Sequence, residues 1–256
     1  MKKEKEIKME VMLGDYRFVL KDVIANLIFT SPPYNIGSKA ERRDGFRKFG
    51  RYDPKSYGGI TEYSDTLPED VYQDEQAHFV MWCADHLSRD GILVYNHKPR
   101  RKNKVLIHPM EWLCRSDVRR RMVLMEEIVW NRGSTHNHSN MMMWQTTERL
   151  YVMRKAGAKY RFKNTEVLPH RSDIWRINRA PSNGHDAPFP LELAQAVLLS
   201  WSHKGDLICD PYSGTGTTAV ASLMTNREFI GAEINLHRQK IAMVSILEQR
   251  QREIAA

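Results

Sequence analysis

Cysteine is scarce in this chain of 256 residues: Cys83, Cys114 and Cys209 are the 3 cysteines, and they lie far apart without a CxxC pair. This argues against a disulfide framework or a cysteine-rich zinc site. The 10 histidines show no spacing typical of zinc ligands either. We therefore expect no metal and a reduced, intracellular compartment.

Long apolar runs are also missing, because none approaches the ~20 residues that cross a bilayer. The charged N-terminus, MKKEKEIKMEV, lacks the apolar core of a signal peptide. These absences favour a cytoplasmic protein without a membrane partner. Hydrophobic residues still make up 41% of the chain, which is ordinary for a globular domain and excludes a disordered, collagen-like or coiled-coil chain.

Acidic residues are in the minority, since 31 Asp and Glu face 39 Lys and Arg, a net charge of +8. The excess is concentrated in two stretches. Residues 39–55 hold 7 basic and 3 acidic residues, and residues 98–121 hold 9 basic and 2 acidic ones, so the rest of the chain is net acidic. Such stretches fit a polyanionic partner, but they also fit a solvated surface.

Short apolar runs alternate with helical patterns. Buried strands are predicted at residues 26–30, 92–95, 207–209 and 228–232, and helices at residues 68–87, 192–201, 217–224 and 237–252. This alternation predicts an α/β fold with a mostly parallel sheet flanked by helices. We expect one domain over residues 1–256, with mobile basic insertions at about 35–66 and 97–121 and no large separate recognition domain.

A glycine turn follows the predicted strand at residues 207–209. In Asp210-Pro-Tyr-Ser-Gly-Thr-Gly216, the glycines permit a tight turn and close approach to a ligand at a helix N-terminus. Glu233 comes 19 residues after Gly214, at the end of the next strand, where a carboxylate can bind a ribose diol. Only 23 residues follow Glu233, so a smaller nucleoside cofactor fits better than a dinucleotide. A plain structural turn is the alternative.

A proline turn, Ser31-Pro32-Pro33-Tyr34, ends the apolar run at residues 26–30. Two prolines fix the backbone and remove two N–H donors. Carbonyl oxygens and the Ser31 hydroxyl can accept from an exocyclic amine, while the Tyr34 ring can stack on the planar group that carries it. Seen alone, the turn also fits a structural role.

Together, TSPPY and DPYSGTG resemble the catalytic and S-adenosylmethionine motifs of DNA amino-methyltransferases, in the motif order of their β group. The resemblance spans about residues 11–245 and includes LGDYRFVL, ILVYN, TERLYVMRK, DIWRI, HDAPFPLELAQAVLLSWS and GAEIN. It implies a Rossmann-like methyltransferase fold with circularly permuted motifs. It also implies S-adenosyl-L-methionine as cofactor, double-stranded DNA as partner, no metal, and a homodimer as one option.

The resemblance also implies roles for residues. Ser31, Pro32, Pro33 and Tyr34 would be catalytic, and Tyr34 would stack on the flipped base. The cofactor would be bound by Asp15, Thr30, Phe189, Pro190, Asp210, Tyr212, Ser213, Gly214, Thr215, Gly216, Thr217 and Glu233. DNA would be bound by Lys39, Arg42, Arg43, Arg47, Lys48, Arg100, Arg101 and Lys102.

Ser at position 31, rather than Asp, resembles the cytosine-N4 subgroup, so methylation of cytosine N4 is favoured and methylation of adenine N6 is the alternative. An RNA or protein amino-methyltransferase would use the same chemistry, although the protein glutamine enzymes typically carry NPPY. A non-catalytic nucleic-acid-binding protein is the alternative from another class. Target recognition would rest on residues 37–63 and 99–121.

Overall fold

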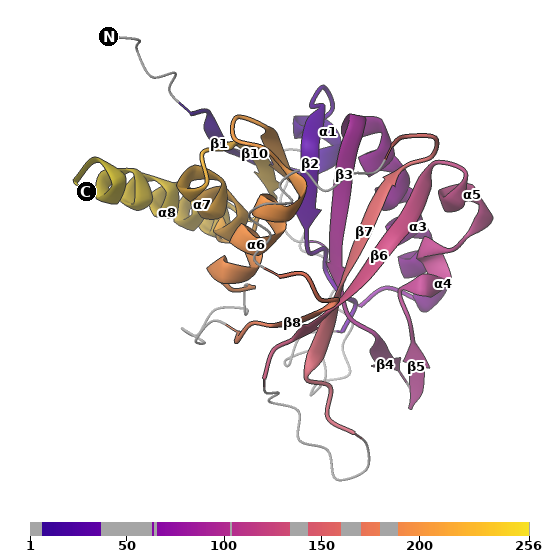
Figure 1. Ribbon diagram of the computed structural model, residues 1–256. Coiled ribbons are helices and arrows are strands. Elements are labelled where there is room, and N and C mark those ends of the chain that lie inside the picture. The colour runs from indigo at the N-terminus through magenta and orange to yellow at the C-terminus, as the bar shows by residue number, and fades with distance from the viewer. Residues whose placement is uncertain are drawn as a thin grey trace.

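The computed structural model describes residues 7–36, 63, 66–102, 104–133, 143–159, 170–179 and 189–255. They form an α/β fold around an eight-stranded sheet with the order β1-β10-β9-β2-β3-β7-β6-β8 (Figure 1). The strands of this sheet are β1 (Met9–Leu13), β2 (Ala25–Thr30), β3 (Leu87–His97), β6 (Met122–Asn131), β7 (Thr147–Lys155), β8 (Ile174–Arg176), β9 (Leu207–Asp210) and β10 (Glu228–Glu233).

The sheet is mostly parallel, as predicted. Strands β1, β10, β9, β2 and β3 pair parallel with one another in this order, and β8 pairs parallel with β6. Strand β7 runs against both of its neighbours, β3 and β6. The carboxyl ends of the parallel strands therefore lie at one edge of the sheet, and β7 begins at this same edge.

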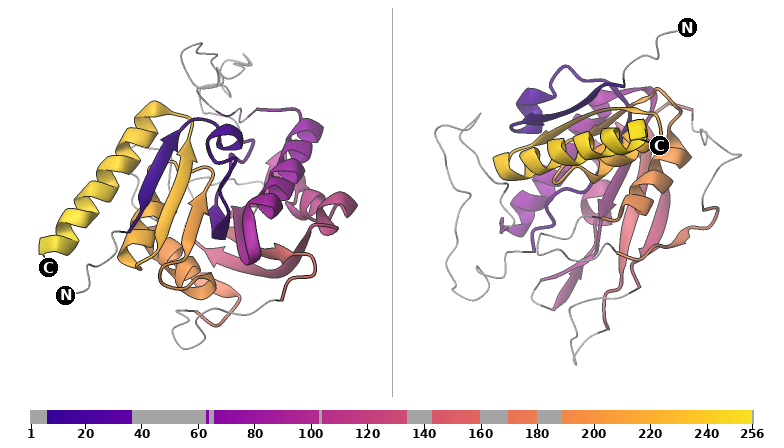
Figure 2. Two further views of the ribbon diagram at one scale, coloured as in Figure 1. Left: turned by 90° about the horizontal axis from the view of Figure 1, so that it is seen from above. Right: turned by 90° about the vertical axis from the view of Figure 1, so that its left-hand side faces the viewer.

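Buried apolar side chains lie on both faces of the sheet, because successive side chains of a strand point in opposite directions. Leu27 and Phe29 of β2 join one apolar cluster, and Ile28 joins a second one. The first cluster contains α6 (Leu191–Trp201), α7 (Thr217–Met224) and α8 (Leu236–Ala255), and the second contains α1 (Tyr16–Val19) and α3 (Glu69–His86). Figure 2 shows α3 and α6 on opposite sides of the sheet.

The basic stretch at residues 97–121 differs from our expectation of a mobile insertion. Its described residues form a hairpin of β4 (Arg100–Lys102) and β5 (Val105–Ile107), then α4 (Met110–Leu113) and α5 (Ser116–Arg119). Apolar side chains fix this stretch to the rest of the fold, because Trp112, Leu113 and Val118 are buried in the same cluster as α3. Of the other expected insertion, residues 37–62 and 64–65 lie outside the described residues.

Candidate active site

The proline turn and the glycine turn lie side by side. They follow β2 and β9, which pair in parallel through Leu27–Ile208 and Ile28–Cys209. The two strand ends are joined by a hydrogen bond of 2.7 Å from Thr30 Oγ1 to Asp210 Oδ1. The carboxyl edge of a parallel sheet is where α/β proteins place their ligands, so the two turns predicted from the sequence share one candidate site.

The Asp210 carboxylate accepts hydrogen bonds from three groups at this edge of the sheet. Its Oδ1 accepts from Thr30 Oγ1 and from the Tyr212 backbone N–H at 3.1 Å, and its Oδ2 accepts from Thr218 Oγ1 at 2.7 Å. The side chain is buried, and this burial raises the carboxyl pKa to about 6, although the hydrogen bonds oppose the rise. Asp210, Thr30 and Thr218 thus join β9, β2 and α7 at the glycine turn, and the contact of Asp210 with a cofactor stays a prediction.

The two glycines of the turn have different surroundings. Gly214 has φ +54, and a Cβ added to it would meet no atom within 4 Å, so its Cα faces open space. Gly216 has φ +87, and a Cβ there would meet the Ala242 Cβ at 2.8 Å. Gly216 therefore permits packing of the turn on α8, whereas Gly214 leaves room beside the turn for a ligand. Thr215 and Thr217 flank Gly216 and are half-buried.

Glu233 ends β10 and faces the glycine turn. Its Oε2 accepts from the Gly214 N–H at 2.9 Å, and its Oε1 accepts from the Asn235 N–H at 2.8 Å. Burial raises the carboxyl pKa above its usual range. Each carboxylate oxygen has a second lone pair, so Glu233 can accept two further hydrogen bonds from a diol next to Gly214. Glu233 is thus in direct contact with the glycine turn, and its binding of a ribose stays a prediction.

Asp15 lies close by, because Leu13 of β1 pairs with Glu233 of β10. Its carboxylate caps α1 by accepting from the Arg17 N–H and forms an ion pair with the Arg17 guanidinium at 2.6 Å. Asp15 therefore has partners within its own helix cap. Aromatic rings surround this end of the site: the ring centroids of Tyr16 and Tyr212 are 5.2 Å apart, and those of Tyr63 and Tyr212 are 4.8 Å apart.

Other residues expected to bind the cofactor also gather here. Phe189 packs its ring on Phe29 of β2 at a centroid distance of 4.8 Å, and Pro190 precedes the first turn of α6. Ser213 Oγ donates to the Asp210 carbonyl at 2.9 Å, so this hydroxyl stabilises the turn itself. A Cβ at Gly231 would lie 2.0 Å from this hydroxyl, which explains the glycine in β10.

The proline turn places Tyr34 over the end of β3. The Tyr34 hydroxyl lies 2.8 Å from Ser31 Oγ and donates toward Asn96 Oδ1 at 3.1 Å and Glu148 Oε2 at 3.0 Å. Its ring lies against the His97 ring at a centroid distance of 4.3 Å. Burial and the Glu148 carboxylate raise the Tyr34 pKa well above its usual range, so the phenol stays protonated.

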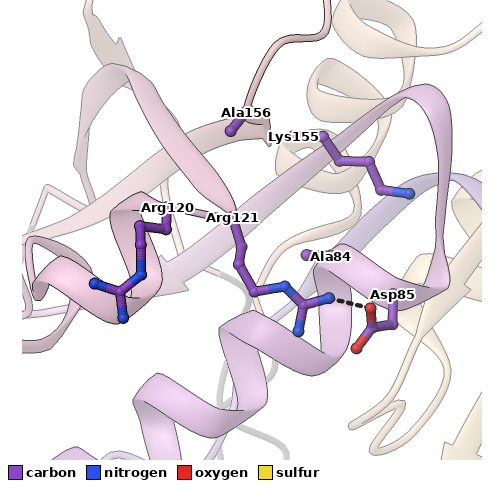
Figure 3. Close-up of a pocket in the computed structure, with 6 residues that line it drawn as sticks. All are labelled: Ala84, Asp85, Arg120, Arg121, Lys155 and Ala156. Carbon is purple, nitrogen blue, oxygen red and sulfur yellow. Dashed lines mark hydrogen bonds and ion pairs between the residues drawn. The ribbon is translucent and has the colours of Figure 1, made fainter.

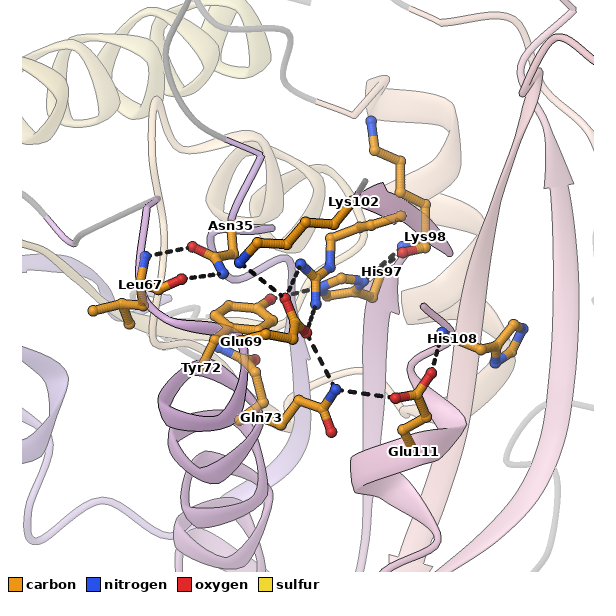
Figure 4. Close-up of polar contacts among 12 residues, drawn as sticks. Asn35, Leu67, Glu69, Tyr72, Gln73, His97, Lys98, Lys102, His108 and Glu111 are labelled. Atoms are coloured by element: carbon orange, nitrogen blue, oxygen red, sulfur yellow. Dashed lines mark hydrogen bonds and ion pairs between the residues drawn. The ribbon is translucent and has the colours of Figure 1, made fainter. Parts of the chain in front are cut away.

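Tyr72 of α3 and Leu67, just before this helix, form a clamp on the proline turn and Asn35; Figure 4 shows Asn35, Leu67, Tyr72 and His97. The Tyr72 hydroxyl donates to the Pro33 carbonyl at 2.8 Å and lies 2.7 Å from His97 Nε2. Asn35, at φ +55, bonds the backbone N–H and carbonyl of Leu67 at 2.7 and 3.0 Å. Burial lowers the His97 pKa well below its usual range, so this ring is neutral.

Sequence reasoning missed the polar residues around the turn, namely Tyr72, Asn96, His97, Arg132 and Glu148. A signal was present: Asn96 and His97 end an apolar strand, and both are buried. A polar pair that continues an apolar run into the core needs partners, and that need points to a site.

The expected DNA contacts divide into three groups. Arg100 is buried: its side chain is 2% exposed and pairs with Glu69 at 2.6 Å, with its guanidinium 4.5 Å from the Tyr72 ring centroid. The structure thus places Arg100 inside the fold rather than at a DNA surface. Arg101 and Lys102 are exposed on the hairpin. The other five lie outside the described residues: Lys39, Arg42, Arg43, Arg47 and Lys48.

A polar pocket lies away from this edge, near Leu87 at the start of β3 (Figure 3). Its lining includes Arg120, Arg121 and Lys155. Arg121 pairs with Asp85, and Lys155 Nζ donates to the Leu87 carbonyl at 2.6 Å. Within the described part of the chain, no cluster of His, Cys, Asp and Glu could hold a metal ion. No helix in the same residues has the length and apolar character to cross a bilayer.

Comparison with known proteins identifies similar sequences. A family described as DNA methylase, N6_N4_Mtase, matches residues 25–244. The type II methyltransferase M.SmaI of Serratia marcescens is 30% identical over 139 residues, which is 50% of this chain and 47% of that protein. The DNA adenine methyltransferase YhdJ of Escherichia coli K12 is 23% identical over 266 residues, covering 91% of this chain and 81% of YhdJ.

The matched lengths limit what these relatives imply. The orphan methyltransferase M.BamHII of Bacillus amyloliquefaciens is 38% identical, but over 90 residues, 31% of this chain and 34% of that protein. The chain thus spans about a third to a half of the length of M.BamHII and M.SmaI.

Solved structures share the fold. The PvuII DNA methyltransferase, cytosine-N4-specific, superposes with a TM-score of 0.68 at 17% identity, covering 96% of both chains. M1.HpyAVI in complex with SAM superposes with a TM-score of 0.62 at 15% identity, covering 93% of this chain and 98% of that one. At these identities the likeness concerns the fold, which is the methyltransferase fold expected from the two motifs.

Proposed function

This chain belongs to the N6/N4 DNA methylase family, and we propose that it transfers a methyl group from S-adenosyl-L-methionine to the exocyclic amine of a base in double-stranded DNA. The observation that carries this proposal is the joint position of the two turns. Ser31 and the glycine turn follow neighbouring parallel strands that are tied by the hydrogen bond between Thr30 and Asp210. Such a transfer requires a hydrogen-bond acceptor for the target amine and a binding site for the nucleoside cofactor, both at the same edge of the sheet.

The glycine turn fits a nucleoside cofactor. Gly214 faces open space, and a side chain there would fill the space that we assign to the ligand. Glu233 presents a buried carboxylate with two lone pairs to spare, which suits the ribose hydroxyls. The rings of Tyr16, Tyr63 and Tyr212 offer apolar surface next to Asp15. The cofactor, when bound, supplies a methyl group that is already activated on sulfur.

The proline turn fits the amine. Ser31 Oγ and the Pro32 carbonyl would accept the two N–H groups, and they would turn the nitrogen lone pair toward the methyl group. His97 packs on the Tyr34 ring, so the flipped base would stack on the ring face away from His97. The clamp from Tyr72 and Asn35 makes the turn rigid before the base arrives, and such preorganisation lowers the barrier to transfer.

We favour cytosine N4 as the acceptor because the turn carries a neutral Ser31. A carboxylate at this position would be the stronger acceptor for an adenine amine. Adenine N6 is the alternative, and the similarity to YhdJ over 91% of the chain supports it.

The hairpin β4–β5 is the described surface that best fits the DNA backbone. Arg101 and Lys102 are exposed on it, and Arg101 Nη1 donates to the Met143 carbonyl at 3.0 Å. This bond joins the hairpin to the segment before β7, where Met143 and Trp144 are exposed. Cations next to exposed apolar side chains suit a duplex whose phosphates are bound while a base leaves the stack.

One experiment tests the function. The purified protein is incubated with double-stranded DNA and cofactor carrying a labelled methyl group, and the DNA is then digested and its nucleosides are separated by mass spectrometry. N4-methylcytosine is the expected product. N6-methyladenine would correct the base and keep the chemistry. If the cofactor binds and no labelled nucleoside forms, DNA is not the substrate and the proposal is overturned. DNA binding without any affinity for the cofactor would favour the non-catalytic alternative and overturn the proposal as well.

A further inference from the structure

A chain of hydrogen bonds leads from Ser31 to a buried carboxylate. Ser31 Oγ lies 2.8 Å from the Tyr34 hydroxyl, and this hydroxyl donates to Glu148 Oε2 at 3.0 Å. Glu148 is 7% exposed and lies at the start of β7. Because β7 is antiparallel to β3, its first residues lie beside His97, at the edge that holds the proline turn.

Arg132, from the end of β6, supplies the counter-charge. Its Nη1 pairs with Glu148 Oε1 at 2.9 Å, and its Nη2 donates to the Gln145 carbonyl at 3.0 Å. A buried carboxylate that is paired and hydrogen-bonded in this way can keep its charge. Since Arg132 takes Oε1, the second oxygen of Glu148 faces Tyr34.

The direction of the chain follows from counting protons. A phenol has one proton to donate. Two acceptors face the Tyr34 hydroxyl: Glu148 Oε2 and Asn96 Oδ1, whose orientation is set because Asn96 Nδ2 donates to the Arg149 carbonyl at 3.0 Å. The Tyr34 proton therefore points toward these acceptors. In the contact between Ser31 and Tyr34, the proton must then come from Ser31, which leaves the Ser31 lone pairs pointing away from Tyr34.

We propose that Glu148 is a positioning residue for methyl transfer, which acts through Tyr34 to hold the Ser31 hydroxyl as an acceptor for the target amine. This inference rests on the proposed function. During transfer, the bond from carbon to sulfur breaks with its electron pair left on sulfur, and the nitrogen pair forms the bond to carbon. One N–H proton passes to Ser31 Oγ, while the Ser31 proton moves to Tyr34 and the Tyr34 proton moves to Glu148. The negative charge of Glu148 thus stabilises the positive charge that develops on the amine nitrogen.

The first test is Glu148→Gln, which keeps the shape of the side chain and removes its charge. A hydrogen bond to a charged group is worth about twice a neutral one, so kcat should fall about 10- to 100-fold. The Kd for cofactor and the KM for DNA should stay unchanged, because Glu148 is proposed to act only through Tyr34. The matched control is Glu127→Gln on the neighbouring strand, where Glu127 pairs with Arg149 and lies in the exposed part of the sheet. An unchanged kcat in E148Q would overturn the proposal.

A double-mutant cycle separates this role from a structural one. Tyr34→Phe removes the hydroxyl that connects Glu148 to Ser31, so adding E148Q to Y34F should lower kcat no further. If E148Q costs the same factor with and without the Tyr34 hydroxyl, Glu148 acts by another route and the proposal is wrong. Glu148→Asp keeps the charge, and its kcat should lie between those of wild type and E148Q; an equal loss in both would also contradict the proposal.

A measurement that needs no substrate separates the failure of this inference from failure of the function. In protein with ¹³Cζ-labelled tyrosine, the Tyr34 resonance is identified by its loss in Y34F. This resonance should shift in E148Q and stay in place in E127Q. If it does not respond to E148Q, the contact on which the inference depends is absent, whatever the protein does to DNA. If it responds and no DNA is methylated by the wild type, the proposed function is at fault and this inference falls with it.

Discussion

The Tyr72 hydroxyl donates to the carbonyl oxygen of Pro33 at 2.8 Å, so a helix on one face of the sheet holds the turn at its edge. The same hydroxyl lies 2.7 Å from His97 Nε2, and the His97 ring packs on Tyr34. Because the one Tyr72 hydroxyl proton goes to Pro33, the contact with His97 fits a neutral ring that donates from Nε2 to the Tyr72 oxygen. One hydroxyl thus fixes both the backbone of the turn and the ring beneath its tyrosine.

Tyr72→Phe should slow methyl transfer without weakening cofactor binding. The change leaves the Pro33 carbonyl and His97 Nε2 without this partner, which should lower the free energy of unfolding by about 1–3 kcal/mol. We expect a lower kcat and an unchanged Kd for the cofactor, measured by methyl incorporation and by calorimetry. Tyr95→Phe is a matched control, since the Tyr95 hydroxyl donates to Gln76 at 2.7 Å, on the same helix. Equal kcat losses in the two variants would contradict the clamp.

Asp210→Asn should flatten the pH dependence of stability. The folded pKa of Asp210, about 6, is raised above its ordinary value of 3.8. Protonation is thus favoured by folding, and the stability that it contributes is present below about pH 4 and lost as the pH rises through about 6. The loss is on the order of 3 kcal/mol. Urea unfolding from pH 4 to 7 measures it: the wild type should lose stability relative to D210N across this range, and a constant difference would refute the assignment.

Gly214→Ala and Gly216→Ala should fail in different ways. Both glycines have positive φ, and a side chain there costs about 1–2 kcal/mol. At Gly216 the new Cβ also meets Ala242 at 2.8 Å, so this variant should unfold at a lower temperature than G214A. At Gly214 the new Cβ enters the space assigned to the cofactor, so G214A should bind the cofactor more weakly while it remains folded. Thermal unfolding and calorimetry distinguish the two, and normal cofactor affinity in G214A would move the site elsewhere.

Arg101→Ala and Lys102→Ala should weaken DNA binding at the hairpin. Each lost phosphate contact should reduce the slope of log K against log salt by about 1. Arg100→Ala should instead destabilise the fold, because its guanidinium is buried and paired with Glu69. Titrations of a fluorescent duplex at several salt concentrations, together with thermal unfolding, check all three variants. An unchanged salt slope in R101A and K102A would exclude the hairpin as a phosphate site.

The sequence predicted the two turns because their chemistry is local. Prolines after an apolar strand, and glycines between a strand and a helix, have few conformations, so their positions in the fold followed directly. The contact between Glu233 and Gly214 could also be expected, since the ends of neighbouring parallel strands share an edge.

The partners of the turn could not be predicted in this way. Glu148 and Tyr72 reach the site from strand β7 and helix α3, and no spacing in the sequence states which strand pairs with β3 or in which direction. Arg100 was misplaced for a related reason. In the sequence, Arg100 cannot be told apart from the other cations of its basic run. Its burial depends on contacts with Glu69 and with the rings of Tyr72 and Trp112, which lie in other segments of the chain.

The reversed direction of β7 has a consequence for engineering. Strand β6 ends and β7 begins at the sheet edge that carries the proline and glycine turns. Asn131 and Thr147 are paired there, so the two ends of the connection between these strands lie side by side. The free-energy cost of lengthening such a connection grows slowly with its length. A DNA-recognition module could therefore be inserted between β6 and β7, next to the candidate active site, without a change in the register of the sheet.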